Sequence, residues 1–485
     1  MESPPSTRPF RRGSFYHLLL PSCILLVLIL LGSCTKEPSA PTEPQVDEPE
    51  VNVDPQIVAW LRSNCLPFRT SKAESGFEDL ASLKEMVGSA RVVALGEATH
   101  GTKEFFEMKH RILEFLVKEM GFNIFAIEAT WPESNLVNDY VQTGIGDPAR
   151  LLAGLYFWTW NTQEVLDMIL WMRRHNQNPG SAPKVSFYGF DMQYPKMAMD
   201  NVIAYLQKID PPSARRADSL YSFYRPYQTN QSGYGGASSD VKITCRTNLR
   251  LVYDHLVAHR ALYEGKSSAR EFALALQSAR VAIQAEEVFS KEDPGTRDQF
   301  MAENAQWLLD QAAADSMIVL WAHNGHVSAS ITGGSMGSFL RSVYGGTMVV
   351  LGFDFYGGSF NAVSWNLATG TATGPLTSHH VEKPPSDSYE YLFRGAGIPR
   401  FMLDLRRIPT GDPASSWIHG PRKFRSIGAI YDAKSPQSFY YSVQLPRVFD
   451  VLVYFQDTSP SVLLPFYSGS MAPMEQPHPP APRVF

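Results

Sequence analysis

A glutamate and a histidine lie three positions apart in the stretch Leu95-Gly-Glu97-Ala-Thr-His100. A carboxylate beside an imidazole suits proton transfer, because the carboxylate can fix the tautomer of the ring and stabilise its protonated form. Such a pair could activate a water molecule. The same two residue types are also common in ordinary exposed loops, so their spacing alone leaves both interpretations open.

The pair lies between two recognisable sequence patterns. Apolar and β-branched residues at 92–95 predict a short strand. From 103 to 120 apolar residues recur at helical spacing, and Gly121 suits the position just after a helix. The order strand, turn, helix puts Glu97 and His100 in a turn at the carboxyl end of a strand. Open α/β sheets bind their ligands at such turns.

Four further apolar runs end in the same way, at residues 123–127, 184–188, 317–321 and 347–351. Near-continuous apolar runs separated by helical patterns predict a parallel sheet that is covered on both faces. The polar residues that follow the five runs are Glu97, His100, Glu128, Asp191, His323, His326 and Asp354. Because parallel strands end at one edge of the sheet, we expect these side chains to converge. Asp191 and Asp354 are expected to be structural, as turn or helix-capping carboxylates.

The expected fold is therefore α/β, a mostly parallel sheet flanked by helices, with a large helical insertion and a few antiparallel edge strands. Helical spacing dominates from about 195 to 314, and an insertion there would roof the site. Arg297 and Asp298 fall within it; they could reach the site from the insertion or pair with each other, and pairing is the favoured interpretation. Antiparallel strands at the sheet edge are expected at 358–365, 437–445 and 448–454.

The N-terminus has the pattern of a secretory signal. Arg8, Arg11 and Arg12 precede an apolar run at 18–31, which ends in Leu31-Gly-Ser-Cys34. This ending resembles the lipobox of bacterial lipoproteins, which implies cleavage before Cys34 and lipidation of its thiol. We expect a signal peptide at 1–33, a Pro-rich acidic tether at 34–55, a folded domain at 56–466 and a flexible tail at 467–485. The expected location is the cell envelope, lipid-anchored at the outer membrane on either its periplasmic or its surface face.

The net charge bears on possible binding partners, and the cysteines bear on possible disulfides. The formal net charge is −5 and the basic residues form no cluster, which argues against nucleic acid as a partner. Apart from Cys34 and the signal region, the chain has Cys65 and Cys245. These two could form one disulfide or remain two buried thiols.

Several of these motifs together resemble the erythromycin esterase family. They are Leu95-Gly-Glu-Ala-Thr-His100, Ala126-Ile-Glu128, Gly189-Phe-Asp191, Arg297-Asp298 followed by Met301-Ala-Glu-Asn, Trp321-Ala-His-Asn-Gly-His326, and Leu445-Pro-Arg-Val-Phe-Asp450. The resemblance runs in the same order from about Ile57 to Pro465. It implies an esterase that opens a macrolide lactone without a metal, the activity behind one form of antibiotic resistance, and no cofactor is expected.

The resemblance also implies roles for single residues. His100 would be the general base that activates water, and Glu97 would orient it. Glu128, His323 and His326 would match the other active-site positions. Lys109 stands where resistance-type members carry an arginine, and either cation could stabilise an oxyanion. Because arginine and lysine differ in geometry, the substrate is left open between a macrolide-like lactone and an acyl-sugar ester.

A serine hydrolase is a competing hypothesis. Gly333-Gly-Ser335-Met-Gly337 matches the pattern of a nucleophile elbow, and Asp354 and His380 follow in the appropriate order. The elbow needs a firm strand directly before it, whereas residues 328–332 are short and polar. The serine mechanism is therefore the weaker hypothesis.

A zinc-dependent hydrolase and a glycan-binding protein are two more hypotheses, and they use different residues. The zinc enzyme could take its ligands from His100, His323, His326, Glu128 and Asp191, although their spacings match no metal motif. A non-catalytic surface lipoprotein could bind a glycan by stacking sugars on the aromatic run Tyr156-Phe-Trp-Thr-Trp160. Ordinary packing explains that run at least as well, and Glu97 with His100 favours catalysis over binding.

Overall fold

The computed structural model describes residues 52–466, except residues 182, 230, 292, 331–333 and 413–414. The expected signal peptide, the lipidation site at Cys34, the tether up to residue 51 and the tail after residue 466 lie outside the described residues. Among the helices that are described, none has the length and apolar character needed to cross a membrane.

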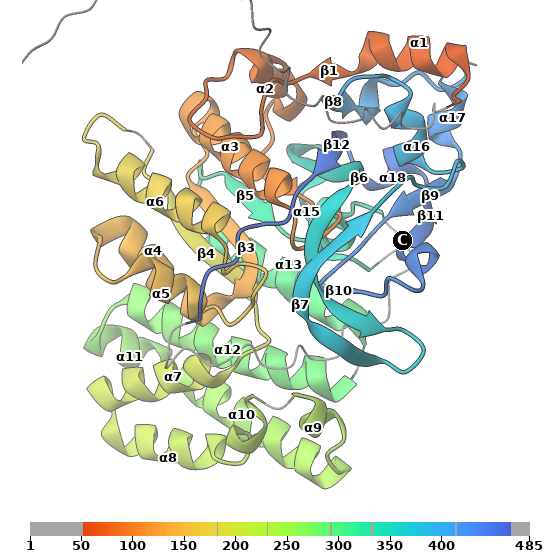
Figure 1. Ribbon diagram of the computed structural model, residues 1–485. Helices are drawn as coiled ribbons and strands as arrows, with labels where there is room; N and C mark the ends of the chain where they lie inside the picture. Colours follow the sequence, from red (N-terminus) through yellow and green to blue (C-terminus); the bar gives the residue numbers. More distant parts are fainter. Residues whose placement is uncertain are drawn as a thin grey trace, which may run out of the picture. The chain divides into compact units, whose positions relative to one another are not determined.

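A sheet of ten strands, counted over the described residues, forms the centre of the molecule (Figure 1). Its strands are β1 (Leu66–Pro67), β2 (Val92–Leu95), β3 (Ile124–Thr130), β4 (Ser186–Asp191), β5 (Ile318–Trp321), β6 (Met348–Asn366), β7 (Thr371–Val381), β8 (Arg400–Asp404), β10 (Ile430–Tyr431) and β12 (Val451–Thr458). The order is β1-β8-β12-β6-β2-β5-β3-β4, with β7 and β10 paired to β6. The neighbours β12, β6, β2, β5, β3 and β4 are all parallel. The predicted fold class is confirmed.

Helices cover both faces of this sheet (Figure 1). Before the insertion they are α1 (Pro55–Asn64), α2 (Ala81–Val87), α3 (Lys103–Met120), α4 (Trp131–Thr143), α5 (Pro148–Ala153) and α6 (Gln163–Gln177). After it they are α14 (Asn324–Val327), α15 (Met336–Tyr344), α16 (Tyr389–Arg394), α17 (Ser416–His419) and α18 (Leu445–Val448). Helix α3 ends at Gly121, whose φ of 80° is the left-handed conformation that favours glycine.

Strand β2 shows why the central strands are apolar along their whole length. Val93 and Leu95 pack into the core on one face of the sheet, while Val92 and Ala94 pack into the core on the other. Alternate side chains of a strand point to opposite faces, so a strand covered on both faces has no polar positions. The first polar residue that follows such a strand therefore marks the edge of the sheet.

The helical insertion comprises α7 (Lys196–Ile209), α8 (Pro211–Tyr221), α9 (Gln231–Gly235), α10 (Ser239–Ala258), α11 (Arg260–Lys266), α12 (Ala269–Lys291) and α13 (Pro294–Asp310). Residues from α7, α8, α10 and α12 form a hydrophobic core of their own. In Figure 1 these helices gather at the lower end of the molecule. Helix α13 differs from the rest, because it packs against β4 and so belongs also to the sheet.

Two of the three predicted edge strands are wrong. Strand β12 lies inside the sheet, parallel to β6 and antiparallel to β8, rather than at the edge. Within 437–445 a 3-10 turn (Pro436–Phe439) leads into β11 (Tyr440–Val443), which pairs with β9 (Arg422–Arg425) in a separate small sheet. All three segments have an antiparallel neighbour, but only 358–365 takes its expected place in the main sheet, as the second half of β6 against β7. Apolar periodicity identifies a strand but not its neighbour, which is set by long-range packing.

The two cysteines of the described domain are both unpaired and buried. Cys65 belongs to one of the sheet cores, whereas Cys245 lies in the core of the insertion. The structure therefore selects two thiols over a disulfide.

Candidate active site

Glu97 follows β2 after one residue, Gly96, and its carboxylate has no exposed surface. Its Oε1 accepts a hydrogen bond from His100 Nδ1 at 2.6 Å. Its Oε2 accepts from Lys109 Nζ at 2.6 Å and from Trp321 Nε1 at 2.8 Å. Burial alone would raise the pKa of Glu97, but the charge of Lys109 and the bond from His100 outweigh it and lower the pKa. Glu97 is thus an ionised, rigidly held partner for one nitrogen of His100.

The other ring nitrogen of His100, Nε2, has no hydrogen-bond partner among the described residues. The His100 side chain keeps 13% of its surface exposed. Its ring lies 5.1 Å from the ring of His323, centroid to centroid, and 6.0 Å from that of Trp160. Because Nδ1–H donates to Glu97, Nε2 carries the lone pair. An imidazole oriented in this way can take a proton from water.

Lys109 does not have the position that an oxyanion donor requires. It lies on α3 beneath Glu97 with no exposed surface, and Nζ is 4.4 Å from the ring centroid of Trp321. Burial lowers the pKa of Lys109 to about 8, against the opposing effect of Glu97. The structure therefore corrects the role suggested for Lys109, because this ammonium group supports Glu97 and cannot contact a substrate.

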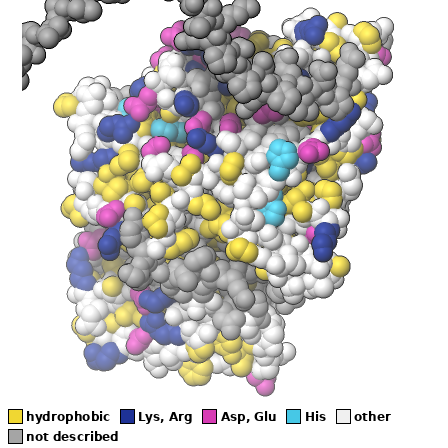
Figure 2. Space-filling model, viewed as in Figure 1, with side chains coloured by type: hydrophobic (Ala, Val, Ile, Leu, Met, Phe, Trp, Pro, Cys, Tyr) yellow, Lys and Arg dark blue, Asp and Glu magenta, His cyan; other side chains and the backbone are white. Residues whose placement is uncertain are grey.

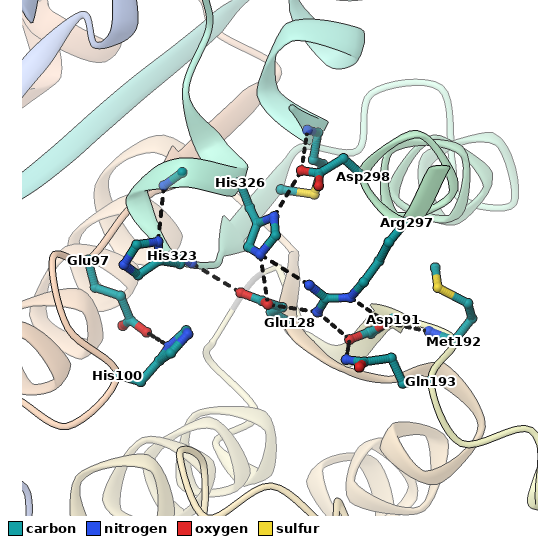
Figure 3. Close-up of polar contacts among 12 residues, drawn as sticks. Glu97, His100, Glu128, Asp191, Met192, Gln193, Arg297, Asp298, His323 and His326 are labelled. Carbon is teal, nitrogen blue, oxygen red and sulfur yellow. Dashed lines mark hydrogen bonds and ion pairs between the residues drawn. The ribbon is translucent and has the colours of Figure 1, made fainter. Parts of the chain in front are cut away.

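A second polar cluster faces the first, centred on Glu128 in β3 (Figure 3). Glu128 Oε1 accepts from Arg297 Nη2 at 2.8 Å and lies 3.3 Å from His326 Nε2. Its Oε2 accepts from the backbone N–H of His323 at 3.1 Å. Burial would raise the pKa of Glu128, but His326 and Arg297 lower it well below its usual value. Glu128 is therefore a second ionised carboxylate in the site.

Arg297 and Asp298 both reach the site from the first turns of α13, which corrects the expectation that they pair with each other. Arg297 Nη1 lies 3.1 Å from His326 Nε2, and Arg297 Nη2 donates to Asp191 at 2.6 Å. Asp298 Oδ1 lies 2.9 Å from the opposite ring nitrogen, His326 Nδ1. Adjacent helix residues point in different directions, so they contact different partners more readily than each other. Here both hold His326.

The two strand-end aspartates have different positions. Asp191 was expected to be structural, and its carboxylate does accept from the backbone N–H of Met192 at 2.7 Å. It also anchors Arg297, which makes it part of the site. Asp354 lies outside the site, where burial and the neighbouring Glu390 raise the pKa of its carboxyl group. The expected convergence therefore holds for all the strand-end residues except Asp354.

His323 lies between the two clusters (Figure 3), and both of its ring nitrogens are engaged. Nδ1 accepts from Gly325 N–H at 3.2 Å, so Nε2 carries the proton and donates to the Ile427 carbonyl at 3.2 Å. Burial and the nearby His100 lower the pKa of His323 to about 3. The ring of His323 is therefore neutral and fixed. It is better suited to separating the two clusters than to acting as a general acid.

One segment of the site carries no sequence signal. Ile427 N–H donates to the Ala98 carbonyl at 2.7 Å, while the Ile427 carbonyl accepts from His323. A side chain at the next residue, Gly428, would lie 3.8 Å from the His100 ring. The segment therefore lies against both imidazoles. Backbone contacts of this kind leave no mark in residue type, so sequence reasoning could not have found them.

The serine mechanism lacks its geometry. Ser335 is the N-cap residue of α15, and its Oγ donates to the Ser328 carbonyl at 2.6 Å and accepts from Ser338 N–H at 3.2 Å. His380 instead lies 3.0 Å from the hydroxyl of Ser359, in the β6–β7 pair. The Ser335 hydroxyl therefore caps a helix and has no histidine beside it.

The zinc and glycan hypotheses also find little support in the contacts. In the part of the chain that the structure describes, no three His, Cys, Asp or Glu side chains are grouped so as to hold a metal ion. The aromatic run is mostly buried, and Trp160 Nε1 donates to the Glu128 carbonyl at 2.8 Å. The run therefore packs beneath Glu128, as ordinary packing predicts.

Known proteins resemble this chain in sequence and in fold. The family model described as erythromycin esterase matches residues 117–458, a range that begins after Glu97 and His100. Erythromycin esterase type II from Escherichia coli is 23% identical over 433 residues, which cover 83% of this chain and 98% of that protein. A crystal structure of a Bacillus cereus protein superimposes with a TM-score of 0.75 at 28% identity, covering 84% of this chain and 99% of the other. An erythromycin esterase mutant in its open conformation has a TM-score of 0.62 at 16% identity, covering 79% and 95%.

Proposed function

Because the chain belongs to the erythromycin esterase family, we propose that it hydrolyses a carboxylic ester or lactone of a small molecule with water activated by His100. The observation that carries this proposal is the 2.6 Å bond from His100 Nδ1 to the buried carboxylate of Glu97, with Nε2 left unengaged. An ester hydrolase needs a base for water and a donor for the oxyanion. We assign the first role to His100 and the second to Arg297.

The proposed reaction proceeds in two proton transfers. His100 Nε2 takes a proton from water as the water oxygen bonds to the ester carbonyl carbon, which becomes a tetrahedral oxyanion. Glu97 stabilises the resulting imidazolium through Nδ1. The C–O bond to the alkoxide then breaks, and His100 returns the proton to the leaving oxygen. The products are a carboxylic acid and an alcohol, joined in one molecule if the substrate is a lactone.

Arg297 is the proposed oxyanion donor. Its guanidinium is held by Asp191 and Glu128, and its Nη1 side meets only the ring nitrogen of His326 among the described residues. Burial alone would lower the pKa of Arg297, but Asp191 and Glu128 raise it, so the group stays charged. A fixed positive charge in a partly dry site stabilises a developing oxyanion without reorganisation. His326, between Asp298 and Glu128, positions this guanidinium.

The substrate class follows from family likeness and is proposed as a macrolide-like lactone or an acyl-sugar ester. The test is a hydrolysis screen of macrolides and acylated sugars with the full chain, with products identified by mass spectrometry. On a substrate so found, His100→Ala should lower kcat by about two to four orders of magnitude. Glu97→Gln should cost less, and the double variant should be little worse than His100→Ala, because the two residues act as one unit.

A matched control is His380→Ala, which removes an exposed imidazole that contacts Ser359 rather than a residue assigned to the site, and it should leave kcat unchanged. If His100→Ala kept near-full activity on a confirmed substrate, the assignment of the base would be wrong. Activity should also survive EDTA and serine-directed phosphonates. Loss with chelator and recovery with zinc would favour a metallohydrolase, and labelling of Ser335 would favour a serine enzyme.

A further inference from the structure

A polar cleft of about 460 Å³ lies in the helical insertion, lined by residues of α10, α11, α12 and α13. Helices α10, α11 and α12 lie toward the lower end of the molecule in Figure 1, and α13 lies between them and the sheet. The cleft is of the size that small-molecule sites have. None of the residues assigned to hydrolysis lines it, so the proposed reaction does not account for it.

A chain of three amide side chains runs between α12 and α13 along the wall of this cleft. Gln277 Nε2 donates to Asn304 Oδ1 at 2.8 Å, and Asn304 Nδ2 donates to Gln284 Oε1 at 3.0 Å. Asn304 Nδ2 also donates to the Phe190 carbonyl at 3.0 Å, which uses both of its hydrogens. These bonds fix which atom of each amide is oxygen and which is nitrogen.

One N–H donor in this chain of amides has no acceptor. Gln284 is 1% exposed, yet its Nε2 has no hydrogen-bond partner among the described residues. Buried polar groups in folded proteins nearly always have partners, so an orphan donor on the wall of a cleft needs an explanation. A ligand oxygen seated in the cleft would supply the missing acceptor.

The charges around the cleft cancel. Arg280 donates to Glu303 at 2.8 Å, and Arg260 donates to Glu264 at 3.1 Å. Each guanidinium is therefore already balanced by a carboxylate, and the cleft has no net charge to attract an ion. Both ion pairs retain unused donors and acceptors, which can still bond neutral hydroxyl groups.

An aromatic surface completes the lining. The ring of Trp307 is half-buried, and it is held in a T-shaped contact with Trp131 at 5.4 Å between ring centroids. Tyr253 contributes a second partly exposed ring. Flat, rigid rings beside paired donors and acceptors suit a ligand with apolar C–H faces and many hydroxyl groups.

We propose that this cleft is a non-catalytic binding site for a neutral saccharide. A sugar ring packs its C–H face on Trp307, its hydroxyl groups bond the ion pairs at the rim, and one sugar oxygen accepts from Gln284 Nε2. A charged ligand would have to disrupt an existing ion pair, and a wholly apolar one would leave the Gln284 donor unsatisfied.

The test is isothermal titration calorimetry of the full chain with maltotriose, cellotriose and N,N′,N″-triacetylchitotriose. Gln284→Met removes the orphan donor with little change in volume and should weaken the tightest of these about threefold or more. Trp307→Leu should weaken it about tenfold. Gln207→Met is the same Gln-to-Met substitution at an exposed position of α7, and it should leave the sugar affinity unchanged. Thermal unfolding of each variant establishes that it is folded.

Glu128→Gln, an active-site variant, should bind the sugar as the wild type does, and this result separates the cleft from the hydrolytic site whether or not an ester substrate is found. The proposal is overturned if none of the three sugars binds at about 10 mM, well above the range of weak specific affinities. It is also overturned if Gln284→Met and Trp307→Leu both bind normally, or if glucuronate or glucosamine binds more tightly than the neutral sugars.

Discussion

Three donors converge on the Glu97 carboxylate, from His100, Lys109 and Trp321. Taking a carboxylate fully out of water is expensive unless its charge is paired and its oxygens are hydrogen-bonded. Glu97 meets both conditions inside the fold, and of the three donors only His100 keeps exposed surface. The orientation of the proposed base therefore depends on two fully buried residues, Lys109 and Trp321.

The first prediction concerns the pair Glu97 and Lys109. Lys109→Met should lower the free energy of unfolding by about 3–5 kcal/mol, because it leaves a buried carboxylate without its counter-charge. The double variant Glu97→Gln with Lys109→Met should lose less than the sum of the single losses, as measured by urea unfolding. Lys196→Met breaks an exposed ion pair with Asp200 and should cost no more than about 1 kcal/mol. Additive losses at Glu97 and Lys109 would contradict the pairing.

The second prediction concerns Glu133, in the first turn of α4. Both of its carboxyl oxygens are buried without a well-formed hydrogen bond, and burial raises the pKa from its usual 4.5 to about 7, against a smaller effect of Thr130. Between these two pH values the folded chain keeps a proton that the unfolded chain has released. The contribution of Glu133 to stability therefore falls as the pH rises from about 4.5 to about 7.

Glu133→Gln should remove this loss. The free energy of unfolding of Glu133→Gln minus that of the wild type should be about 2–3 kcal/mol larger at pH 8 than at pH 4. Denaturant titration of both proteins at both pH values measures this difference. Glu119→Gln, a change at an exposed position of α3, should show no such pH dependence. A difference between wild type and Glu133→Gln that is the same at both pH values would rule out the titration.

At the scale of elements, the site is an edge of the sheet where β2, β3, β4 and β5 all end. Their order, β2-β5-β3-β4, brings residues from distant parts of the chain side by side. Asn324 joins this edge to β6, because its amide bonds both the N–H and the carbonyl of Phe353 at 3.1 and 2.8 Å. The same side chain fills the space beside Gly96.

The third prediction follows from that contact. A Cβ atom at Gly96 would lie 2.2 Å from Asn324 Oδ1, which is fixed by its bonds to Phe353. Gly96→Ala should therefore lower the free energy of unfolding by about 1–3 kcal/mol and reduce kcat, since Glu97 is the next residue. Gly346→Ala meets nothing within 4 Å and should change neither quantity. An unchanged kcat in a folded Gly96→Ala variant would show that the turn tolerates the shift.

The sequence predicted the strand ends well because a strand buried on both faces leaves an unbroken apolar run, and the polar residue after it marks the edge. That reasoning brought Glu97, His100, Glu128, His323 and His326 together. It could not place Arg297, which enters from the insertion about 106 positions after its partner Asp191. Nor could it place β12, whose apolar pattern is the same at an edge as between two neighbours. The positions of Arg297 and β12 both depend on contacts between segments that are far apart in the sequence. Such contacts produce no periodic pattern of apolar residues.

At the scale of the whole molecule, the described part of one face suits a small neutral or weakly charged substrate better than a polyanion (Figure 2). On the face drawn in Figure 2, basic and acidic side chains are interspersed and form no patch of one sign. The formal net charge of −5 agrees with this pattern. An extended basic stripe, which nucleic acids require, is not seen on that face.

The fourth prediction concerns the N-terminus, which lies outside the described residues. The sequence Leu31-Gly-Ser-Cys34 after a basic and then apolar stretch predicts a mature chain that begins at a lipidated Cys34. Mass spectrometry of detergent-extracted membranes should find the diacylglyceryl mass on the N-terminal peptide, and Cys34→Ser should release the protein from that fraction. An unmodified peptide that spans residues 30–40 would contradict the prediction.

Helix α13 carries Arg297 in its first turn, Asn304 two turns later, about 10 Å along the axis, and Trp307 almost three turns later, about 15 Å along it. Asn304 also bonds Phe190, which directly precedes the aspartate that anchors Arg297. The proposed saccharide site and the proposed oxyanion donor therefore lie on one helix, through which binding at either site can be coupled to binding at the other. Thermodynamic linkage is reciprocal, so whatever factor a sugar imposes on substrate affinity, the substrate must impose on the sugar. One measured ratio therefore fixes the other, and the proposed saccharide would then set the concentration at which the proposed hydrolytic site fills.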